Sequence, residues 1–330
     1  MSEIALSVNN LVVEFPTDSG PLRAVDRVSF ELERGTIMGL IGESGCGKST
    51  VAFALLNSVP TPGQIVSGQV DYPNVGNLLK MSDEAQRLFR WQHVAVVFQA
   101  SQNTLNPLRR INEQIRELAT AHRIRDPKTL LEQADSLCRR LRLDSRRVLQ
   151  AYPHQLSGGM KQRVGIMLAL LLKPDILVFD EPTTALDGLS QESVLQIIRE
   201  IHDEEGLTGI FITHDLGIVS EVADTVAVMY AGRMVEVASA KTIFSGPKHP
   251  YSQALMNALP RLSGDPHLAR GLRGSPPKVI GDQFKCLFRD RCEQRMEVCD
   301  QSEPQLMPVA GEDAQVACFL QRKEVERVSV

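Results

Sequence analysis

The segment 42–49, Gly-Glu-Ser-Gly-Cys-Gly-Lys-Ser, constrains the fold of this chain more than any other stretch. It follows a short apolar run, 36–41, typical of a buried strand in a parallel sheet, and it precedes an apolar helix predicted over 51–57. The glycines let the loop curve so that several backbone N–H groups converge on one phosphate, and the positive end of the helix adds to this attraction. The spacing G-x-x-x-x-G-K-[ST] in this context therefore predicts a nucleotide-binding phosphate loop.

Two side chains of this loop have predicted roles in phosphate binding. Lys48 is placed to reach the β- and γ-phosphates, and Ser49 to bind Mg²⁺. Cys46 most simply fills a position where only small size matters, because free cysteine behaves mostly as a small buried residue. The loop residues expected to surround the nucleotide are Gly42, Ser44, Gly45, Cys46, Gly47, Lys48, Ser49 and Thr50.

A second buried-strand pattern, 176–179, ends in the acidic pair Asp180 and Glu181. Ligands of parallel α/β sheets bind at the carboxyl ends of the strands. Asp180 is therefore placed to hold Mg²⁺, and Glu181 to polarise the attacking water as a general base. Strand and helix patterns alternate along this region, which predicts a parallel sheet with helices on its faces. The strands are predicted at 4–15, 25–32, 36–41, 93–99, 176–179, 208–213 and 225–229.

Residues 156–163, Leu-Ser-Gly-Gly-Met-Lys-Gln-Arg, open another predicted helix. The Ser157 hydroxyl and the glycine amides, Gly159 included, make a second anion site there. One nucleotide does not need two phosphate-binding segments 110 residues apart in sequence. A head-to-tail dimer explains both, with Ser157 and Gly159 facing the nucleotide held by a partner's phosphate loop.

Four of the six cysteines lie near the end of the chain, at Cys286, Cys292, Cys299 and Cys318. The chain begins without the basic and then apolar layout of a signal peptide, so a metal or cluster site is favoured over a disulfide framework. The spacings differ from the C-x₂-C pairs of zinc ribbons. By themselves they fit Zn²⁺ or a [4Fe–4S] cluster, and unliganded cysteines are the remaining alternative.

Composition excludes two further classes. The net charge of −4 gives no strongly basic surface for nucleic acid, and no apolar run approaches the ~18–20 residues that span a membrane. Composition shifts near residue 260 towards a Gly- and Pro-rich stretch, 263–277. This shift predicts a domain boundary near residue 260, and the family resemblance described next implies an ATP-binding domain over 1–260, with a helical subdomain near 100–160, and a C-terminal extension over 261–330.

The order of motifs over residues 4–235 resembles that of ABC transporter ATP-binding subunits. The resemblance implies an α/β P-loop NTPase fold with a helical subdomain, a small loop-rich C-terminal cysteine domain, and ATP hydrolysis with Mg²⁺ as the activity. The matching motifs are Walker A at 42–49, the Q-loop at 97–99, the signature at 156–160, Walker B at 176–181, the D-loop at 185–187 and the H-loop at 212–215.

The same resemblance implies roles for residues outside the phosphate loop. Phe15 would stack on adenine, and His214 would contact the γ-phosphate. Gln99 would sense Mg²⁺ and the attacking water, and Asp187 would communicate between the two ATP sites of a dimer. Met160 stands where the family commonly has glutamine, a change that we expect to be tolerated.

The C-terminal region is similar to the extension of dipeptide and oligopeptide permease ATPases. The similarity rests on 249–255, His-Pro-Tyr-Ser-Gln-Ala-Leu, and on the four cysteines, which in that group are associated with an iron–sulfur cluster. The resemblance therefore implies a [4Fe–4S] cluster on these cysteines, with Zn²⁺ as the alternative. A structural or regulatory role is favoured over electron transfer, because no partner redox motif is visible elsewhere in the sequence.

As a whole, the resemblance implies an ATPase that powers solute import, with a peptide as the leading substrate and oligosaccharide or nickel as alternatives. The implied partners are a second, non-identical ATPase subunit, two transmembrane permease subunits and an extracytoplasmic solute-binding protein. The chain would sit peripherally on the cytoplasmic face of the inner membrane and bind no nucleic acid. A non-transport ABC ATPase is a weaker alternative, because the ~100 residues between Walker A and the signature leave no room for a coiled-coil insertion.

Overall fold

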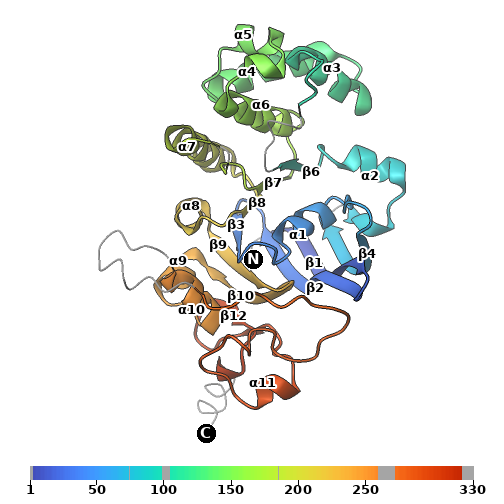
Figure 1. The fold of residues 1–330 in the computed structure, drawn as a ribbon. Helices are drawn as coiled ribbons and strands as arrows, with labels where there is room; N and C mark the ends of the chain where they lie inside the picture. The colour runs from blue at the N-terminus through green and yellow to red at the C-terminus, as the bar shows by residue number, and fades with distance from the viewer. Residues whose placement is uncertain (1–2, 74, 99–104, 185, 259–271, 322–330) are drawn as a thin grey trace. The chain divides into compact units, whose positions relative to one another are not determined.

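The computed structural model describes residues 3–73, 75–98, 105–184, 186–258 and 272–321 (Figure 1). The chain forms two compact units, each assembled from segments far apart in sequence. The helix-rich unit comprises Met1–Ala5, Glu33–Thr36 and Lys80–Phe211, and the strand-rich unit comprises Leu6–Leu32, Ile37–Leu79 and Ile212–Val330. The predicted boundary at residue 260 lies outside the described residues, so the division into 1–260 and 261–330 stays a prediction.

The strand-rich unit contains two groups of paired strands. One has the order β2-β1-β4-β5, with β1 antiparallel to β4. In the other, with the order β11-β12-β10-β9-β3, β3 is parallel to β9, whereas β10 is antiparallel to both β9 and β12. The predicted parallel pairing is thus present, but this sheet is mixed. The strands are β1 (Ile4–Thr17), β2 (Gly20–Glu33), β3 (Ile37–Ile41), β4 (Gln64–Tyr72), β5 (Gly76–Asn77), β9 (Thr225–Tyr230), β10 (Arg233–Ser239), β11 (Met307–Pro308) and β12 (Ala314–Val316).

Short helices complete the strand-rich unit. The mixed sheet that contains β9 and β10 shares one hydrophobic core with the C-terminal segment. Tyr230 of β9 packs on Tyr251 and Phe288, with ring centroids 4.7 and 5.2 Å apart. Residues from the end of the chain therefore belong to the same core as the central strands. The helices are α1 (Lys48–Ala54), η1 (Leu78–Lys80), α8 (Leu216–Val222), α9 (Ala240–Ser245), α10 (Pro250–Asn257) and α11 (Val298–Gln301).

The helix-rich unit carries the strand order β8-β7-β6, with β6 parallel to β7. In the region predicted as a helical subdomain, α3, α4 and α5 pack on one another. No helix in the described part of the chain is both long and apolar enough to cross a bilayer. The elements are α2 (Asp83–Phe89), β6 (Val94–Val97), α3 (Ile111–Ala121), α4 (Pro127–Arg140), α5 (Ser145–Gln150), η3 (Pro153–Gln155), α6 (Gly158–Leu170), β7 (Ile176–Asp180), α7 (Gly188–Glu205) and β8 (Gly209–Ile212).

Local sequence sets the ends of the helices that carry site residues. The Ser157 hydroxyl caps α6 by accepting from Met160 N at 3.3 Å, and the Asp187 carboxylate caps α7 by accepting from Ser190 N at 3.0 Å. Such side chains satisfy backbone donors that have no partner within the helix. At its other end α7 stops at Gly206, whose φ of 64° suits glycine.

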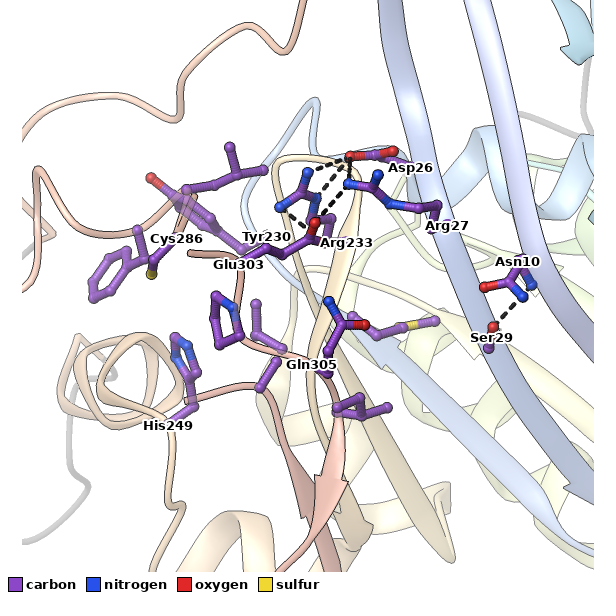
Figure 2. Close-up of a pocket in the computed structure, with 17 residues that line it drawn as sticks. Asn10, Asp26, Arg27, Ser29, Tyr230, Arg233, His249, Cys286, Glu303 and Gln305 are labelled. Atoms are coloured by element: carbon purple, nitrogen blue, oxygen red, sulfur yellow. Dashed lines mark hydrogen bonds and ion pairs between the residues drawn. The ribbon is translucent and has the colours of Figure 1, made fainter. Parts of the chain in front are cut away.

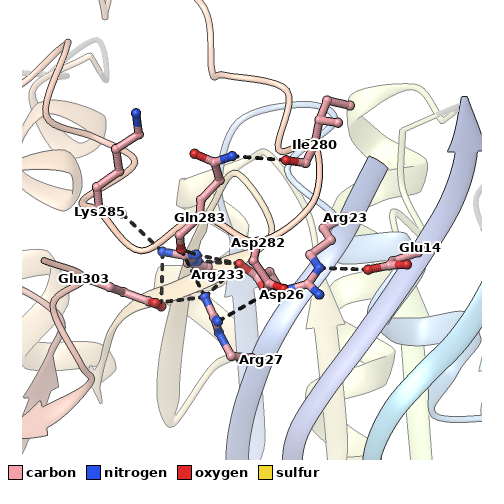
Figure 3. Close-up of polar contacts among 10 residues, drawn as sticks. All are labelled: Glu14, Arg23, Asp26, Arg27, Arg233, Ile280, Asp282, Gln283, Lys285 and Glu303. Atoms are coloured by element: carbon pink, nitrogen blue, oxygen red, sulfur yellow. Dashed lines mark hydrogen bonds and ion pairs between the residues drawn. The ribbon is translucent and has the colours of Figure 1, made fainter. Parts of the chain in front are cut away.

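A network of charged side chains attaches the C-terminal segment to β2 and β10 within the strand-rich unit (Figure 3). The fully buried Asp26 carboxylate accepts from Arg233 Nε at 2.7 Å and from Arg23 Nη1 at 3.0 Å. Arg233 also pairs with Glu303 at 3.1 Å and donates to the backbone oxygen of Gln283. Two regions more than 200 residues apart in sequence are therefore joined through one buried carboxylate.

Replacing Asp26 with asparagine is expected to lower the free energy of unfolding by up to about 3–5 kcal/mol, because it removes the buried carboxylate that Arg233 and Arg23 share and leaves Arg233 with Glu303 as its anionic partner. Urea unfolding followed by circular dichroism measures this loss. Asp135→Asn is the matched control, since its pair with Arg139 is exposed on both sides, and it is expected to cost less than about 0.5 kcal/mol. Equal losses in the two variants would contradict the role of the network.

Candidate functional site

The predicted phosphate loop connects β3 to α1 and is packed closely against backbone on two sides. Gly42 has φ 150°, and a Cβ added to it would lie 2.2 Å from the Met229 oxygen of β9. Gly47 has φ 105°, and its added Cβ would lie 2.1 Å from the Ala24 oxygen of β2. Only glycine fits both places, so these residues are required by the close approach of backbone as well as by loop curvature.

Lys48 is folded back onto this loop. Its buried ammonium donates to the Gly42 oxygen at 2.8 Å and to the Glu43 oxygen at 3.1 Å, and lies 3.7 Å from the Cys46 sulfur. Burial raises the pKa of the Cys46 thiol, although Lys48 opposes this shift. Cys46 is a buried neutral thiol, consistent with its predicted role as a small filling residue. Ser44 and Gly45 on the loop, and Ser49 in the first turn of α1, are exposed.

The predicted acidic pair lies at the end of β7 in the helix-rich unit. Asp180 is buried, and Glu181 is half-buried with φ 48°. Such a backbone conformation is uncommon for a residue with a side chain and collects at functional positions. The Thr184 hydroxyl donates to Glu181 Oε2 at 2.9 Å and orients the carboxylate.

The signature and D-loop segments meet within the same unit, at the N-terminal ends of α6 and α7. A Cβ added to Gly159 would lie 3.1 Å from the Ser190 hydroxyl oxygen. That hydroxyl donates to Asp187 at 2.9 Å, and the backbone N–H and hydroxyl of Ser190 together hold the pKa of Asp187 below its usual range. Ser157 and Asp187 are both exposed.

Besides Asp187, three more residues are assigned by resemblance alone, and they fall in different places. Gln99 lies outside the described residues. His214 follows β8 and is exposed, and Phe15 is half-buried on β1 with its ring against Gly63. The predicted site residues are thus divided: the phosphate loop, Phe15 and His214 belong to the strand-rich unit, and the remaining described ones belong to the helix-rich unit.

The four predicted cluster cysteines come together in the strand-rich unit. They line one cavity whose other walls are mostly apolar side chains such as Phe288 and Phe319. Burial raises the pKa of Cys286 and Cys318 to about 11, and it also raises the pKa of Cys292; neighbouring cysteines add to all three shifts. In the described part of the chain no three Cys, His, Asp or Glu side chains are arranged to ligate a single metal ion.

A second pocket adjoins Cys286 in the same unit (Figure 2). Cys286 and His249 lie on one side, and the Asp26, Arg233 and Glu303 network lies on the other. His249 caps α10 by accepting from Tyr251 N at 3.0 Å, and burial lowers its pKa to about 3. This imidazole is therefore neutral and structural, and the charges around the pocket are already paired with one another.

Sequence reasoning missed one contact, which joins the phosphate loop to the four-cysteine segment. Glu43 of the phosphate loop pairs with Arg291, which precedes Cys292. The two residues are 248 positions apart, so no local pattern could reveal the contact.

The phosphate loop, the acidic strand end and the capped signature helix define an ATP-binding cassette. Comparison with solved structures agrees, since the dimeric cassette MJ0796 superimposes with a TM-score of 0.61 at 25% identity, covering 71% of this chain and 98% of that one. A family model described as "ABC transporter" matches residues 25–184, and one described as "Oligopeptide/dipeptide transporter, C-terminal region" matches residues 235–299.

Two relatives extend this similarity along nearly the whole chain. The dipeptide transport ATP-binding protein DppD of Caldanaerobacter subterraneus subsp. tengcongensis is 39% identical over 96% of this chain and 97% of its own length. The oligopeptide transport ATP-binding protein OppD of Salmonella typhimurium is 37% identical, covering 92% of this chain and 90% of its own. The chain belongs to the ABC transporter ATP-binding subunits, in their dipeptide and oligopeptide family. The predicted α/β P-loop cassette fold and the ATPase class are confirmed, whereas the small C-terminal cysteine domain stays a prediction.

Proposed function

We propose that this chain is the ATPase subunit of a peptide importer, bound peripherally at the cytoplasmic face of the inner membrane. The observation that carries the proposal is the extent of the similarity to peptide-transport ATP-binding proteins, which includes the region after the cassette as well as the cassette itself. ATP-driven closure of a dimer would supply the mechanical work, and membrane-embedded partners would supply the path for the solute.

The ATP-binding roles assigned from sequence become specific under this proposal. Lys48 neutralises phosphate charge, while Ser49 and Asp180 are the residues that would hold Mg²⁺, with Gln99 as a further contact. The ion supplies charge neutralisation at the transferring phosphoryl group. The exposed Ser49 and the buried strand-end Asp180 are oxygen donors of the kind that Mg²⁺ prefers.

Hydrolysis would depend on positioning more than on covalent chemistry. Glu181 accepts a proton from the attacking water, and His214 holds the γ-phosphate. Phe15 stacks on adenine. Ser157 and Gly159 contact the ATP of the opposite subunit, and Asp187 links the two sites. The exposure of His214, Ser157 and Asp187 supports these assignments.

The proposed assembly has a second, non-identical ATPase subunit, two permease subunits and an extracytoplasmic solute-binding protein. The test is ATPase activity of the full assembly in proteoliposomes. We expect binding protein loaded with a peptide to stimulate hydrolysis and binding protein without one to leave it at the basal rate. Stimulation by an oligosaccharide or by nickel instead would keep the ATPase role and overturn the peptide assignment.

We also propose that four cysteines hold a [4Fe–4S] cluster, with Zn²⁺ as the alternative metal. They are Cys286, Cys292, Cys299 and Cys318. What supports the cluster is that all four side chains are thiols, the donors that iron–sulfur clusters use, and that they line one largely apolar cavity. A cluster would tie four points of a segment that is too small to build a separate core.

Protein purified without oxygen is expected to contain about four irons and four sulfides per chain, with visible absorption. Replacing Cys292 with serine should remove that absorption while MgATP binding persists. Cys138→Ser is the control, because Cys138 is buried on α4 of the helix-rich unit and is not among the residues that line the four-cysteine cavity, so it should keep the absorption. One zinc and no iron in the wild-type protein would make the segment a zinc module and refute the cluster.

A further inference from the structure

The phosphate loop and the four-cysteine segment are joined by one ion pair in the strand-rich unit. Arg291 Nη1 lies 2.6 Å from Glu43 Oε2, and Arg291 Nη2 lies 2.9 Å from Glu43 Oε1. Each terminal guanidinium nitrogen thus donates to one carboxylate oxygen, the bidentate geometry that gives arginine–carboxylate pairs their strength and direction. The Arg291 side chain is only 8% exposed, so solvent screens the pair weakly.

Arg291 is itself held in place by several groups. Its guanidinium lies over the Tyr230 ring, 5.6 Å from the centroid, and over the Phe288 ring at 6.0 Å. It also donates to the Tyr230 hydroxyl at 3.3 Å and, through Nε, to the Arg273 oxygen at 2.7 Å. The side chain therefore has one position, and that position is set by the core and by the C-terminal segment.

Glu43 is held through its backbone as well. Its N–H donates to the hydroxyl of the buried Tyr251 at 2.9 Å, and its oxygen accepts from Lys48 at 3.1 Å. The C-terminal half of the chain thus fixes the loop residue whose carbonyl holds the phosphate-binding lysine. A displacement of Glu43 changes where Lys48 rests before nucleotide arrives.

Arg291 lies in the tight turn between Cys286 and Cys292. Within this turn, Arg291 N donates to the Phe288 oxygen at 3.0 Å, and at its start Cys286 N donates to the Cys299 oxygen at 3.0 Å. Whatever binds or modifies Cys286 or Cys292 must act on the backbone that carries Arg291.

We infer that Arg291 is a positioning residue for the phosphate loop, and that through Glu43 it couples nucleotide affinity to the state of the four-cysteine segment. This inference rests on the proposed ATPase function. Because coupling between two sites is reciprocal, nucleotide binding must also change the four-cysteine segment.

The first test is a double-mutant cycle on MgATP affinity, measured on the full chain with a fluorescent ATP analogue. Glu43→Gln and Arg291→Gln are each expected to weaken binding, by between about 5-fold and 150-fold. The double variant should be no weaker than the worse single variant, because both remove the same contact. Arg291→Lys should restore part of the affinity. Arg295→Gln is the matched control, since Arg295 lies in the same segment but pairs with Asp300, and its affinity should match wild type.

The second test measures the reciprocal effect by hydrogen–deuterium exchange over residues 286–299. MgATP is expected to slow amide exchange there in wild type and in Arg295→Gln, and to leave it unchanged in Glu43→Gln. If Arg291→Gln does not fold, Glu43→Gln alone keeps both tests valid, because it breaks the pair from the other side.

The possible failures can be told apart. A wild-type chain that binds no MgATP would overturn the proposed function. If the wild-type chain binds MgATP normally, three results would overturn only the coupling. They are unchanged affinity in the variants, additive losses of affinity in the double variant, and the same exchange response in Glu43→Gln as in wild type.

Discussion

Replacing Gly47 with alanine is expected to abolish MgATP binding. The residue has φ 105°, which costs a residue with a side chain about 1–3 kcal/mol. More decisively, the new Cβ would lie 2.1 Å from the Ala24 oxygen, a backbone atom of β2 that cannot rotate away. The loop must therefore move, and Lys48 and Ser49, the next two residues, move with it.

Gly45→Ala is the matched control for this variant. Gly45 has a similar left-handed backbone, with φ 77°, but nothing lies within 4 Å of its added Cβ. It therefore carries the backbone cost without the clash. We expect titration with a fluorescent ATP analogue to show weakened but saturable binding for Gly45→Ala and no saturable binding for Gly47→Ala. Affinity for Gly47→Ala within a few-fold of wild type would show that the loop accommodates the methyl group, contrary to this argument.

The parts of the site that could be predicted from sequence are those whose chemistry is local. The phosphate loop lies between a fully buried strand and a helix, as its apolar flanks indicate. Asp180 follows a fully buried strand for the same reason. In both cases a short run of residues specifies its own backbone, so the pattern along the chain is sufficient.

β10 shows why other elements could not be predicted. Its sequence, Arg-Met-Val-Glu-Val-Ala-Ser, contains two charged residues, yet both are buried. Arg233 is paired with Asp26, and Glu236 accepts from the backbone N–H groups of Lys248 and His249 at 2.6 and 2.9 Å. A charged side chain can be buried only with such partners. The partner of Arg233 is 207 positions away in sequence, and those of Glu236 are 12 and 13 positions away.

The link between the phosphate loop and the cysteines was invisible for the same physical reason. Glu43 looks like a solvated loop carboxylate in the sequence, and Arg291 like one of several arginines in a charged segment. Only the fold brings Tyr230, Tyr251 and Phe288 together and places the guanidinium against them. Where function depends on contacts between distant segments, sequence patterns can identify the residues involved but do not predict which of them are in contact.

Glu181→Gln is expected to lower the rate of ATP hydrolysis by about 10²–10⁴-fold while leaving MgATP affinity close to that of wild type. Glutamine keeps the size of the side chain and can still accept the hydrogen bond from Thr184, but it cannot take a proton from water. The left-handed backbone at this position is unchanged by the substitution, so the strand end keeps its conformation. Single-turnover hydrolysis in the assembled transporter, together with nucleotide titration, separates the chemical step from binding.

Thr184→Ala separates the chemical role of Glu181 from its orientation. This variant keeps the carboxylate but removes the hydroxyl that lies 2.9 Å from Oε2, so it should slow hydrolysis less than Glu181→Gln does. Hydrolysis at the normal rate by Glu181→Gln in the assembled transporter would exclude Glu181 as the base, because no proton acceptor remains in that side chain.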